Sequence, residues 1–417
     1  MTPHTLDCRG FSLQQTGLTI LKTYNASESG AEFTVLIDTL NAGLRMWLIE
    51  AGAKHWIEFE TDQGVCLTVH RSLSPAQGSI PGLHHIVAAG DSVWACERDR
   101  RLLRVDAESG EVAQVAEIAV KASHLAVDAD QKWIFVADPG ANELLAIASA
   151  DLSVQHRWVA PGGPQLPLVT DDGIVCVTGG GANALTIVRP RAQGYEVQTI
   201  EVDACPHDPL TTPDGKRAFI PCAGDGSVVS VDLEDGRILG RYKAGDGCAH
   251  LALHPDGERL YSANTFDGTV SCLSVEGDLL GQEESGPWAH QPAISPDGRF
   301  VYVANFFNDT ISVFDPDSME KIASLDTEPY PHGLDISPDG RWIVATGFSS
   351  DQIRIYNAAT ITENVSTKST RIDVGRGSSH IAFLADQKIA FVACSVDDHL
   401  ARLDLDAMTC TQRISLN

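Results

Sequence analysis

Short apolar segments alternate with polar turns along most of the chain, from Leu83 onward. One unit recurs about every 40 residues: an apolar segment ends in a Pro-Asp-Gly or related turn, and a second apolar segment follows. A polar turn rich in Asp and Gly leads to a third segment, such as 310–315, and a fourth, such as 321–325. Short segments bounded by turn residues predict β-strands, and this period is typical of propeller blades.

An Asp in the first turn marks each unit, and the mark occurs eight times. A blade of this kind cannot bury both faces alone, so we expect the blades to close radially into a ring. The sequence predicts an all-β propeller over residues 83–417, with eight blades, or seven as the alternative. Because the first unit begins with its inner strand and the last ends with its outer one, we expect no strand exchanged between the ends. The marker residues are Asp91, Asp130, Asp172, Asp214, Asp256, Asp297, Asp339 and Asp386.

The clearest unit begins at His332 and reads His-Gly-Leu-Asp-Ile-Ser-Pro-Asp-Gly-Arg-Trp-Ile-Val-Ala-Thr-Gly. Units that begin at His290 and His250 follow the same pattern. The motif resembles the YVTN family of propellers, and the resemblance extends over residues 83–417. It implies the same propeller fold for this part of the chain.

A different pattern occupies residues 1–72, and a Ser-, Pro- and Gly-containing stretch, 73–82, is typical of a linker. Residues 33–38 are apolar enough for a buried strand, and 41–51 carry apolar residues at helical spacing. Two further alternating segments, 55–60 and 65–71, predict strands. We therefore expect a multidomain chain in which a small α/β domain of order β-α-β-α-β-β precedes the propeller.

The first residues resemble the opening motif of the TusA-like sulfur-carrier family, Leu-Asp-x-x-Gly-x-x-Cys-Pro-x-Pro. Leu6, Asp7 and Gly10 match it, but Leu13 stands where the family has the sulfur-bearing Cys. A leucine cannot carry a persulfide, because that chemistry needs a thiolate. The resemblance thus implies a non-catalytic domain that docks a protein partner or dimerises, with Cys8 as a buried thiol. The two prolines of the motif are replaced by Gln14 and Thr16.

Composition and charge restrict the classes of partner. The chain has 417 residues, 43% of them hydrophobic, and a formal net charge of −26. Such an acidic surface repels phosphate backbones and anionic headgroups, so we expect neither nucleic acid nor membrane partners. The first residues show no secretory signal, and the ten cysteines lack paired spacing. A cytoplasmic protein with free thiols is the expectation that follows.

Half of the 14 histidines stand just ahead of the inner strand of a blade, six or seven residues before the marker Asp. Counting a neighbour, His84, the set is His84, His85, His124, His207, His250, His290, His332 and His380. Only the third unit, with Pro164 and Gln165, lacks one. Because the connections between blades lie at one end of the channel, these side chains are expected to ring its mouth.

Five cysteines are expected near the same end: Cys96, Cys205, Cys222, Cys248 and Cys394. Imidazole and thiolate ligands converging on one axis suit copper, zinc or iron. We therefore predict the histidines as metal ligands, with these thiols as additional ligands or as groups that hold the ligands. The alternative is that repeat duplication copied a hydrogen-bonded structural histidine from blade to blade.

The histidine-rich hub resembles that of the nitrous oxide reductase propellers, and the Leu83-His84-His85 entry resembles the methanethiol oxidase propellers. Both resemblances imply copper. The first functional hypothesis is a copper oxidoreductase, with iron or zinc as alternatives, acting on a small sulfur- or nitrogen-containing compound. The second is a non-catalytic scaffold that binds a small molecule, cofactor or metal. The third is a lactonase- or lyase-type propeller enzyme, for which Glu and Asn would be expected at the hub.

Overall fold

The computed structural model describes residues 4–9, 32–37, 55–61, 64–70, 83–97, 101–119, 121–363, 368–385 and 388–416. The chain divides into two compact units, residues 1–80 and 81–417. Among the described residues, no helix is long and apolar enough to cross a bilayer. The cytoplasmic location stays a prediction.

The described residues of the first unit form one sheet, with strand order β1-β2-β4-β3. The strands are β1 (His4–Asp7), β2 (Glu32–Ile37), β3 (His55–Thr61) and β4 (Gly64–His70). β1 pairs with β2 in parallel, and the other pairs are antiparallel. The three strands predicted after residue 32 are confirmed, and Cys8 is buried as expected. The predicted helix 41–51 lies outside the described residues, so the α/β class and the sulfur-carrier likeness stay predictions.

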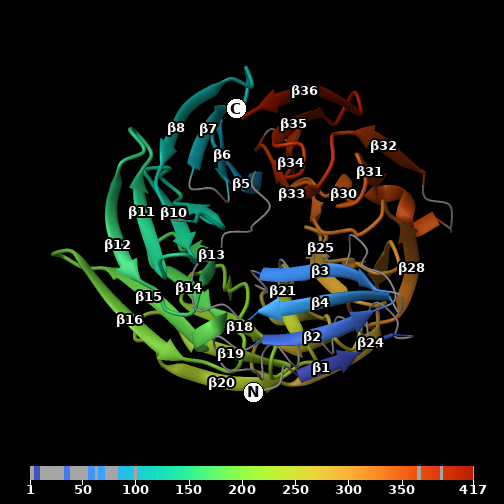
Figure 1. The fold of residues 1–417 in the computed structure, drawn as a ribbon, viewed down its shortest axis with the longest axis horizontal. Helices are drawn as coiled ribbons and strands as arrows, with labels where there is room; N and C mark the ends of the chain where they lie inside the picture. Colours follow the sequence, from blue (N-terminus) through green and yellow to red (C-terminus); the bar gives the residue numbers. More distant parts are fainter. Residues whose placement is uncertain are drawn as a thin grey trace. The chain divides into compact units, whose positions relative to one another are not determined.

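The second unit consists of eight four-stranded sheets in which sequence order and spatial order agree. They stand radially around one axis, as the predicted eight-bladed propeller (Figure 1). Blade 1 comprises β5 (Leu83–Ala89), β6 (Ser92–Glu97), β7 (Arg101–Asp106) and β8 (Val112–Glu117). Blade 2 comprises β9 (Leu125–Val127), β10 (Trp133–Asp138), β11 (Glu143–Ala148) and β12 (Val154–Val159). Blade 3 comprises β13 (Pro164–Val169), β14 (Val175–Gly179), the short helix η1 (Gly180–Ala182), β15 (Ala184–Pro190) and β16 (Tyr195–Glu201).

The remaining blades repeat this order. Blade 4 comprises β17 (Leu210–Thr211), β18 (Arg217–Cys222), β19 (Ser227–Asp232) and β20 (Ile238–Lys243). Blade 5 comprises β21 (Cys248–Leu253), β22 (Arg259–Asn264), β23 (Thr269–Ser274) and β24 (Leu279–Glu284). Blade 6 comprises β25 (Ala289–Ile294), β26 (Val301–Asn305), β27 (Thr310–Phe314) and β28 (Lys321–Asp326). Blade 7 comprises β29 (Leu334–Ile336), β30 (Trp342–Ala345), β31 (Gln352–Asn357), the short helix η2 (Ala358–Glu363) and β32 (Ser369–Asp373). Blade 8 comprises β33 (Ser378–Phe383), β34 (Ile389–Cys394), β35 (His399–Asp404) and β36 (Thr409–Ser415).

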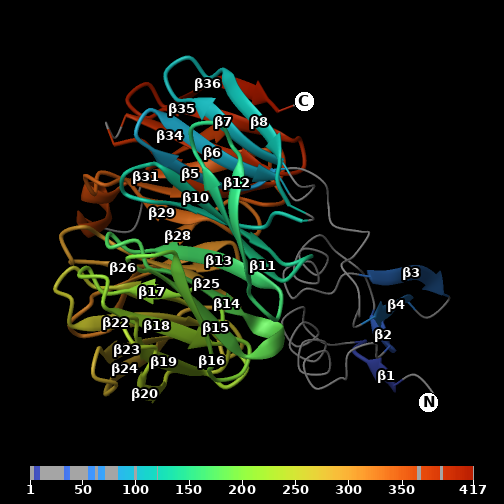
Figure 2. The ribbon, with the colours of Figure 1, turned by 90° about the vertical axis from the view of Figure 1, so that its left-hand side faces the viewer.

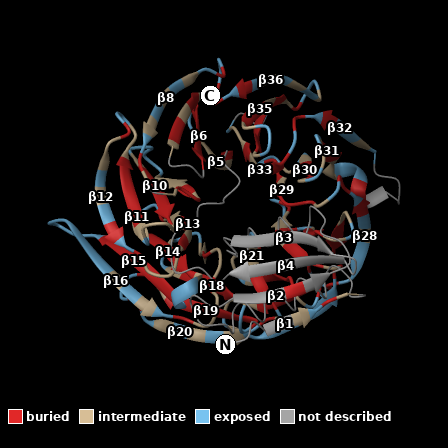
Figure 3. Cartoon of the chain, viewed as in Figure 1, coloured by how far each residue is buried: buried red, intermediate tan, exposed pale blue. Residues whose placement is uncertain are grey.

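Burial follows the place of each strand in its blade. The second and third strands, such as β10 and β11, are buried on both faces, because they lie between neighbouring blades. Outer strands such as β12 alternate between partly buried and exposed residues, as expected for a strand with one face in water. Figure 3 shows this gradient from buried middle strands to an exposed rim. The apolar cores therefore lie between blades, not on the axis.

The Pro-Asp-Gly motif is a turn, as predicted. Gly257, Gly298 and Gly340 all have positive φ, between 72° and 75°, which a residue without Cβ adopts at little cost. The marker Asp297 accepts hydrogen bonds from the Ser295 hydroxyl at 2.6 Å and from the Arg299 backbone N–H at 3.1 Å. The marker Asp thus stabilises the turn between the first two strands.

Blade 8 closes on blade 1 without an exchanged strand, as expected from the order of the repeats. One apolar cluster joins the two blades, and it includes Leu83, Leu103, Phe391 and Leu400. The Leu83 N–H also donates to the Asp398 carboxylate at 3.1 Å. Figure 2 shows the strands of blades 1 and 8 side by side. Side-chain packing across this seam therefore closes the ring.

We expect Phe391→Ala to destabilise the propeller by about 3–5 kcal/mol, because it removes a fully buried ring from the seam. Urea unfolding followed by tryptophan fluorescence measures the change. Leu279→Ala is the matched control, since Leu279 is 51% exposed on an outer strand. Equal urea midpoints of unfolding for the two variants would contradict closure of the ring by side-chain packing.

Candidate metal centre

The axial end of the inner strand carries a β-bulge. In blade 6, Ala289 pairs with Asn305 and Pro292 with Val303, so His290 and Gln291 lie opposite the single residue Ala304. The same shift of register occurs in blades 1, 3, 5 and 8. In blade 4 an isolated bridge between Pro206 and Cys222 precedes the pair Leu210–Phe219, which again leaves one extra residue. A bulge of this type re-aims side chains and breaks the simple alternation of a strand.

The histidines divide between the two residues of this bulge. His84, His207 and His290 occupy its first position, and His332 precedes Leu334 of blade 7 at the same spacing. The second position holds the other half of the set and one carboxylate. These residues are His85, His124, Asp208, His250 and His380.

The two positions explain why the histidines stand either six or seven residues before the marker Asp. Those at seven, such as His290 before Asp297, occupy the first position. Those at six, such as His250 before Asp256, occupy the second. Asp208 stands six residues before Asp214, so it belongs to the same set. The sequence pattern therefore contained this carboxylate, although a search for histidines alone misses it.

All eight predicted histidines come together as one run of neighbouring rings, from blade 4 through blades 5 to 8 and on to blades 1 and 2. The bulge of blade 3 carries Gln165 and Leu166 and contributes no imidazole. The distances between neighbouring ring centroids range from 4.4 to 5.3 Å. From blade 4 to blade 8 they are 4.8 Å for His207–His250, 4.4 Å for His250–His290, 5.2 Å for His290–His332 and 5.3 Å for His332–His380. From blade 8 to blade 2 they are 4.9 Å for both His380–His85 and His85–His124.

Three imidazoles at one side of this run are close enough to share an ion. His84, His124 and His380 each offer a ligand atom, and the three atoms lie within 4.8 Å of one another. The Nε2 atom of His380 is buried and has no hydrogen-bond partner among the described residues. A buried polar atom without a partner costs free energy, so a ligand there would stabilise the site. His85 is held nearby, where its Nδ1 accepts from the Leu125 N–H at 3.4 Å.

Two imidazoles at the hub, those of His85 and His380, have lowered pKa values. Burial lowers the pKa of His85 to about 4, against an opposing effect of Asp208. Burial, and then repulsion from His85, His332 and His124, lowers the pKa of His380 well below its usual value. Neutral imidazole is the form that binds metals, so protons compete weakly for these nitrogens at neutral pH.

A second group combines two imidazoles with the carboxylate. Asp208 lies 3.3 Å from the Nδ1 atom of His207 and 3.3 Å from the Nδ1 atom of His250. Burial by itself raises the pKa of Asp208, but the charges and hydrogen bonds of the two histidines outweigh it. The pKa of this carboxyl is therefore held well below its usual range, and the group is ionised at neutral pH.

Aromatic side chains adjoin the ring on blades 5 to 7. Phe306 lies 6.1 Å from His290 between ring centroids and 5.3 Å from both Phe307 and Tyr330. Trp288 packs 5.0 Å from Phe307. Trp288 and Tyr330 have φ of 59° and 58°, a left-handed conformation that is uncommon for bulky residues. Equivalent positions just ahead of the bulge in blades 3, 5 and 8 hold Gly163, Gly247 and Gly377, also at positive φ.

Four of the five predicted thiol ligands occupy different surroundings from the histidines, and the fifth, Cys205, is partly exposed. Cys96, Cys222, Cys248 and Cys394 are fully buried, each within an apolar core between blades. The Cys96 thiol donates to the Ser123 carbonyl at 3.0 Å, and burial raises the pKa of Cys248 to about 12. None of the five predicted cysteines belongs to the two ligand groups found among the described residues. Ligation by these thiols stays a prediction, and their placement favours a packing role.

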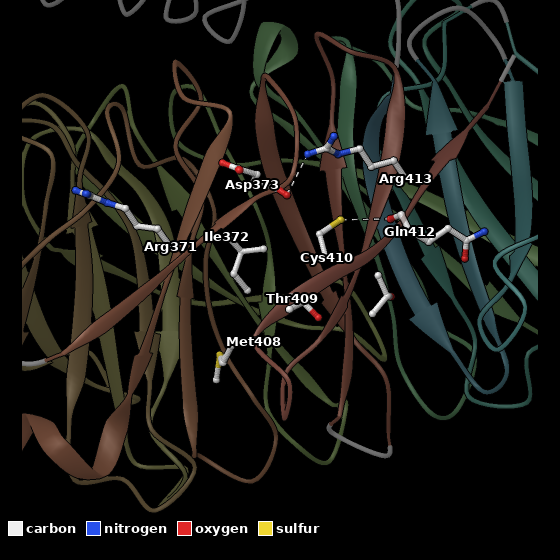
Figure 4. A pocket seen from close by; sticks show the side chains of 9 residues that line it. Arg371, Ile372, Asp373, Met408, Thr409, Cys410, Gln412 and Arg413 are labelled. Carbon is white, nitrogen blue, oxygen red and sulfur yellow. Dashed lines mark hydrogen bonds between the residues drawn. The ribbon is translucent and has the colours of Figure 1, made fainter.

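A cavity of about 500 Å³ lies away from the axis, between β32 of blade 7 and β36 of blade 8 (Figure 4). Ile372, Met408 and Cys410 contribute to its lining. The Cys410 thiol donates to the Gln412 carbonyl at 3.5 Å, and Arg413 donates to the Asp373 carbonyl at 3.3 Å. These contacts satisfy backbone groups at the rim and bring no set of metal ligands together.

We expect Cys248 and Cys394 to resist a thiol reagent in the native protein, because both side chains are fully buried and their pKa values are raised. Cys205 and Cys410 are partly exposed and should react first. Mass spectrometry after brief labelling with iodoacetamide measures this order, with labelling in urea as the control. Rapid native labelling of Cys248 would contradict the packing role.

Solved structures with the same fold include hydrazine synthase of Kuenenia stuttgartiensis, at 13% identity and a TM-score of 0.57, covering 80% of this chain and 98% of that one. The dihydro-heme d1 dehydrogenase NirN in complex with DHE matches at 17% identity and a TM-score of 0.57, covering 76% of this chain and 72% of that one. A candidate 6-phosphogluconolactonase of Bacteroides fragilis matches at 18% identity and a TM-score of 0.52, covering 70% of this chain and 95% of that one. These likenesses establish the propeller fold alone. No curated protein sequence matches the chain.

One family model matches the sequence itself. Its description is lactonase, 7-bladed beta-propeller, and it matches residues 186–329 and 322–417. The two matches overlap and together cover residues 186–417, which is more than half of the chain. The structure has eight blades where the family description gives seven. The chain therefore belongs to the lactonase family of β-propellers.

Proposed function

We propose that this propeller is a metal-binding protein whose centre is formed by His84, His124 and His380. The observation that carries the proposal is the convergence of three imidazole ligand atoms within 4.8 Å, on a side where the buried His380 Nε2 has no hydrogen-bond partner in the described part of the chain. A repeat-derived structural histidine would instead be expected to have each buried nitrogen bonded to protein. His254 is such a case, since its Nε2 lies 2.8 Å from the Gly298 carbonyl.

Copper is the metal we expect first. An all-imidazole set suits copper, zinc and iron, whereas magnesium and calcium prefer oxygen ligands. Three protein ligands leave a coordination position for a small molecule. Copper bound there would supply one-electron redox chemistry, and we propose a small sulfur- or nitrogen-containing compound as substrate. This chain's own residues would hold the ion and exclude protons from the ligand nitrogens.

Metal analysis tests the centre directly. Protein without a histidine tag, loaded with copper and dialysed, should retain at least one equivalent by elemental mass spectrometry. His124→Ala and His380→Ala should each lose most of this copper, because each removes one of three ligands. His156→Ala is the matched control, since His156 stacks on Trp158 at the outer strand β12 and is remote from the ring.

Copper retained equally by all three variants would contradict the proposed centre. Wild-type protein that retains none after loading with copper, zinc or iron would favour the scaffold hypothesis. In that hypothesis the ring binds an organic molecule and the first unit docks a protein partner.

Lactone hydrolysis is the second candidate, and the family match favours it. The expected hub carboxylate is present as Asp208, but histidines take the place of Glu and Asn elsewhere in the ring. Asp208 beside His250 could orient the imidazole as a general base, with the ring nitrogen accepting a proton from water.

This candidate predicts that sugar lactones are hydrolysed faster by the protein than by buffer. A pH indicator measures the proton released when each lactone opens to its acid. His250→Ala should reduce the rate at least about 100-fold, the usual contribution of a general base. Wild-type rates no higher than those of buffer, over both phosphorylated and uncharged lactones, would exclude this activity.

A further inference from the structure

We propose that His207, Asp208 and His250 form a second metal site, of a different ligand class from the three-histidine centre, which takes Zn²⁺ or a similar divalent ion. This inference extends the proposed function to another part of the same ring. It depends on different residues, so the two sites can succeed or fail independently. Apart from the three-histidine group, no other group of three His, Cys, Asp or Glu side chains with ligand atoms this close exists in the described part of the chain.

The distances fit a shared ion. The Nδ1 atoms of His207 and His250 lie 3.3 Å from Oδ1 and Oδ2 of Asp208, respectively. Two ligands on a tetrahedral zinc ion, each at about 2.0–2.1 Å, lie about 3.3–3.4 Å from each other. The two contacts run to different oxygens of the carboxylate, and one ligand atom from each of the three residues lies within 4.8 Å of the other two.

The backbone fixes these three residues at the axis. His207 and Asp208 are the two residues of the blade 4 bulge, and the His207 N–H donates to the Pro221 carbonyl at 2.8 Å. His250 is at the second bulge position of the adjacent blade 5. The bulge therefore lets two consecutive residues of one strand contribute to the same site, which strict alternation would prevent.

The three side chains of the site are partly exposed. The side chains of His207, Asp208 and His250 are 33%, 26% and 15% exposed. On the side of blade 3, the bulge carries Gln165 and Leu166, so its two residues add neither an imidazole nor a carboxylate. Three protein ligands with an open position are typical of a catalytic zinc site, where water or a substrate oxygen completes the shell.

One carboxylate changes which ion is preferred. Two imidazoles and a carboxylate suit divalent zinc, iron or manganese, whereas soft Cu(I) prefers thiolate, thioether or imidazole. The negative charge also partly neutralises a dication, which the three-histidine group cannot do. The alternative arrangement is a carboxylate that only accepts hydrogen bonds from two histidines and binds no ion.

The experiment compares Zn²⁺ binding by four forms of the full-length, metal-free protein, using isothermal titration and elemental analysis. Wild type should bind one equivalent at each site. Asp208→Asn changes the charge with almost no change in shape. This variant should lose one equivalent of zinc, or bind that equivalent more than about 100-fold more weakly. Such a loss exceeds the usual effect of a group that only holds a metal ligand in place. His380→Ala should lose the other equivalent. Asp172→Asn removes an exposed carboxylate from a turn of blade 3 and should behave as wild type.

A second readout identifies the site. Co²⁺ substituted for zinc should give the visible absorption of a tetrahedral ion in wild type, a weaker absorption in His380→Ala and in Asp208→Asn because each keeps one site, and none in the double variant. Unchanged zinc affinity and stoichiometry in Asp208→Asn would overturn the second site. So would wild type that binds only one equivalent in total, with that equivalent abolished by either variant, because that result means one shared site. Zinc bound through Asp208 without any ion bound through His380 would support this inference and overturn the three-histidine centre.

Discussion

The chemistry at the axis depends on one backbone feature, the extra residue at the start of the inner strand in blades 1, 3, 4, 5, 6 and 8. In a regular strand, consecutive side chains point to opposite faces, so each blade would offer one residue to the channel mouth. The bulge places two residues, such as His207 and Asp208, opposite a single residue of the second strand. The ring can therefore hold eight histidines and a carboxylate although blade 3 contributes neither.

The packing between blades keeps this arrangement in place. Each apolar core joins the middle strands of neighbouring blades, and the core that includes Phe391 joins the last blade to the first. Because no strand crosses this seam, the eighth blade is held by side-chain packing and by a few hydrogen bonds, such as that from Leu83 to Asp398. The buried thiols contribute to the same cores, which explains why cysteines cluster near the ring in sequence without joining its ligand groups.

Much of this architecture was predictable because the same sequence pattern recurs in every blade, so each repeat supports the same assignment of strands and turns. The turn marked by Asp297 and its equivalents gives the number of blades, and the end units show that no strand is exchanged. The ring of histidines followed from the same register. Asp208 was missed because only histidines were sought, yet its spacing of six residues from Asp214 equals that of His250 from Asp256.

Other expectations depended on side-chain direction, which spacing alone does not determine. Cys222 and Cys394 end their second strands, and the sequence led us to expect them near the same end of the channel as the histidines. In the fold these positions face the neighbouring blade, so the side chains are buried in apolar cores. Whether a residue at a strand end faces the axis or the adjacent blade depends on the bulge and on strand register, which short-range patterns do not reveal.

Anomalous X-ray diffraction from crystals loaded with copper tests the central claim most directly, because it locates bound ions without reference to activity. The account predicts a copper peak among His84, His124 and His380, at bonding distance from His380 Nε2. Crystals that diffract well after loading, with no anomalous peak anywhere along the histidine ring, would contradict it.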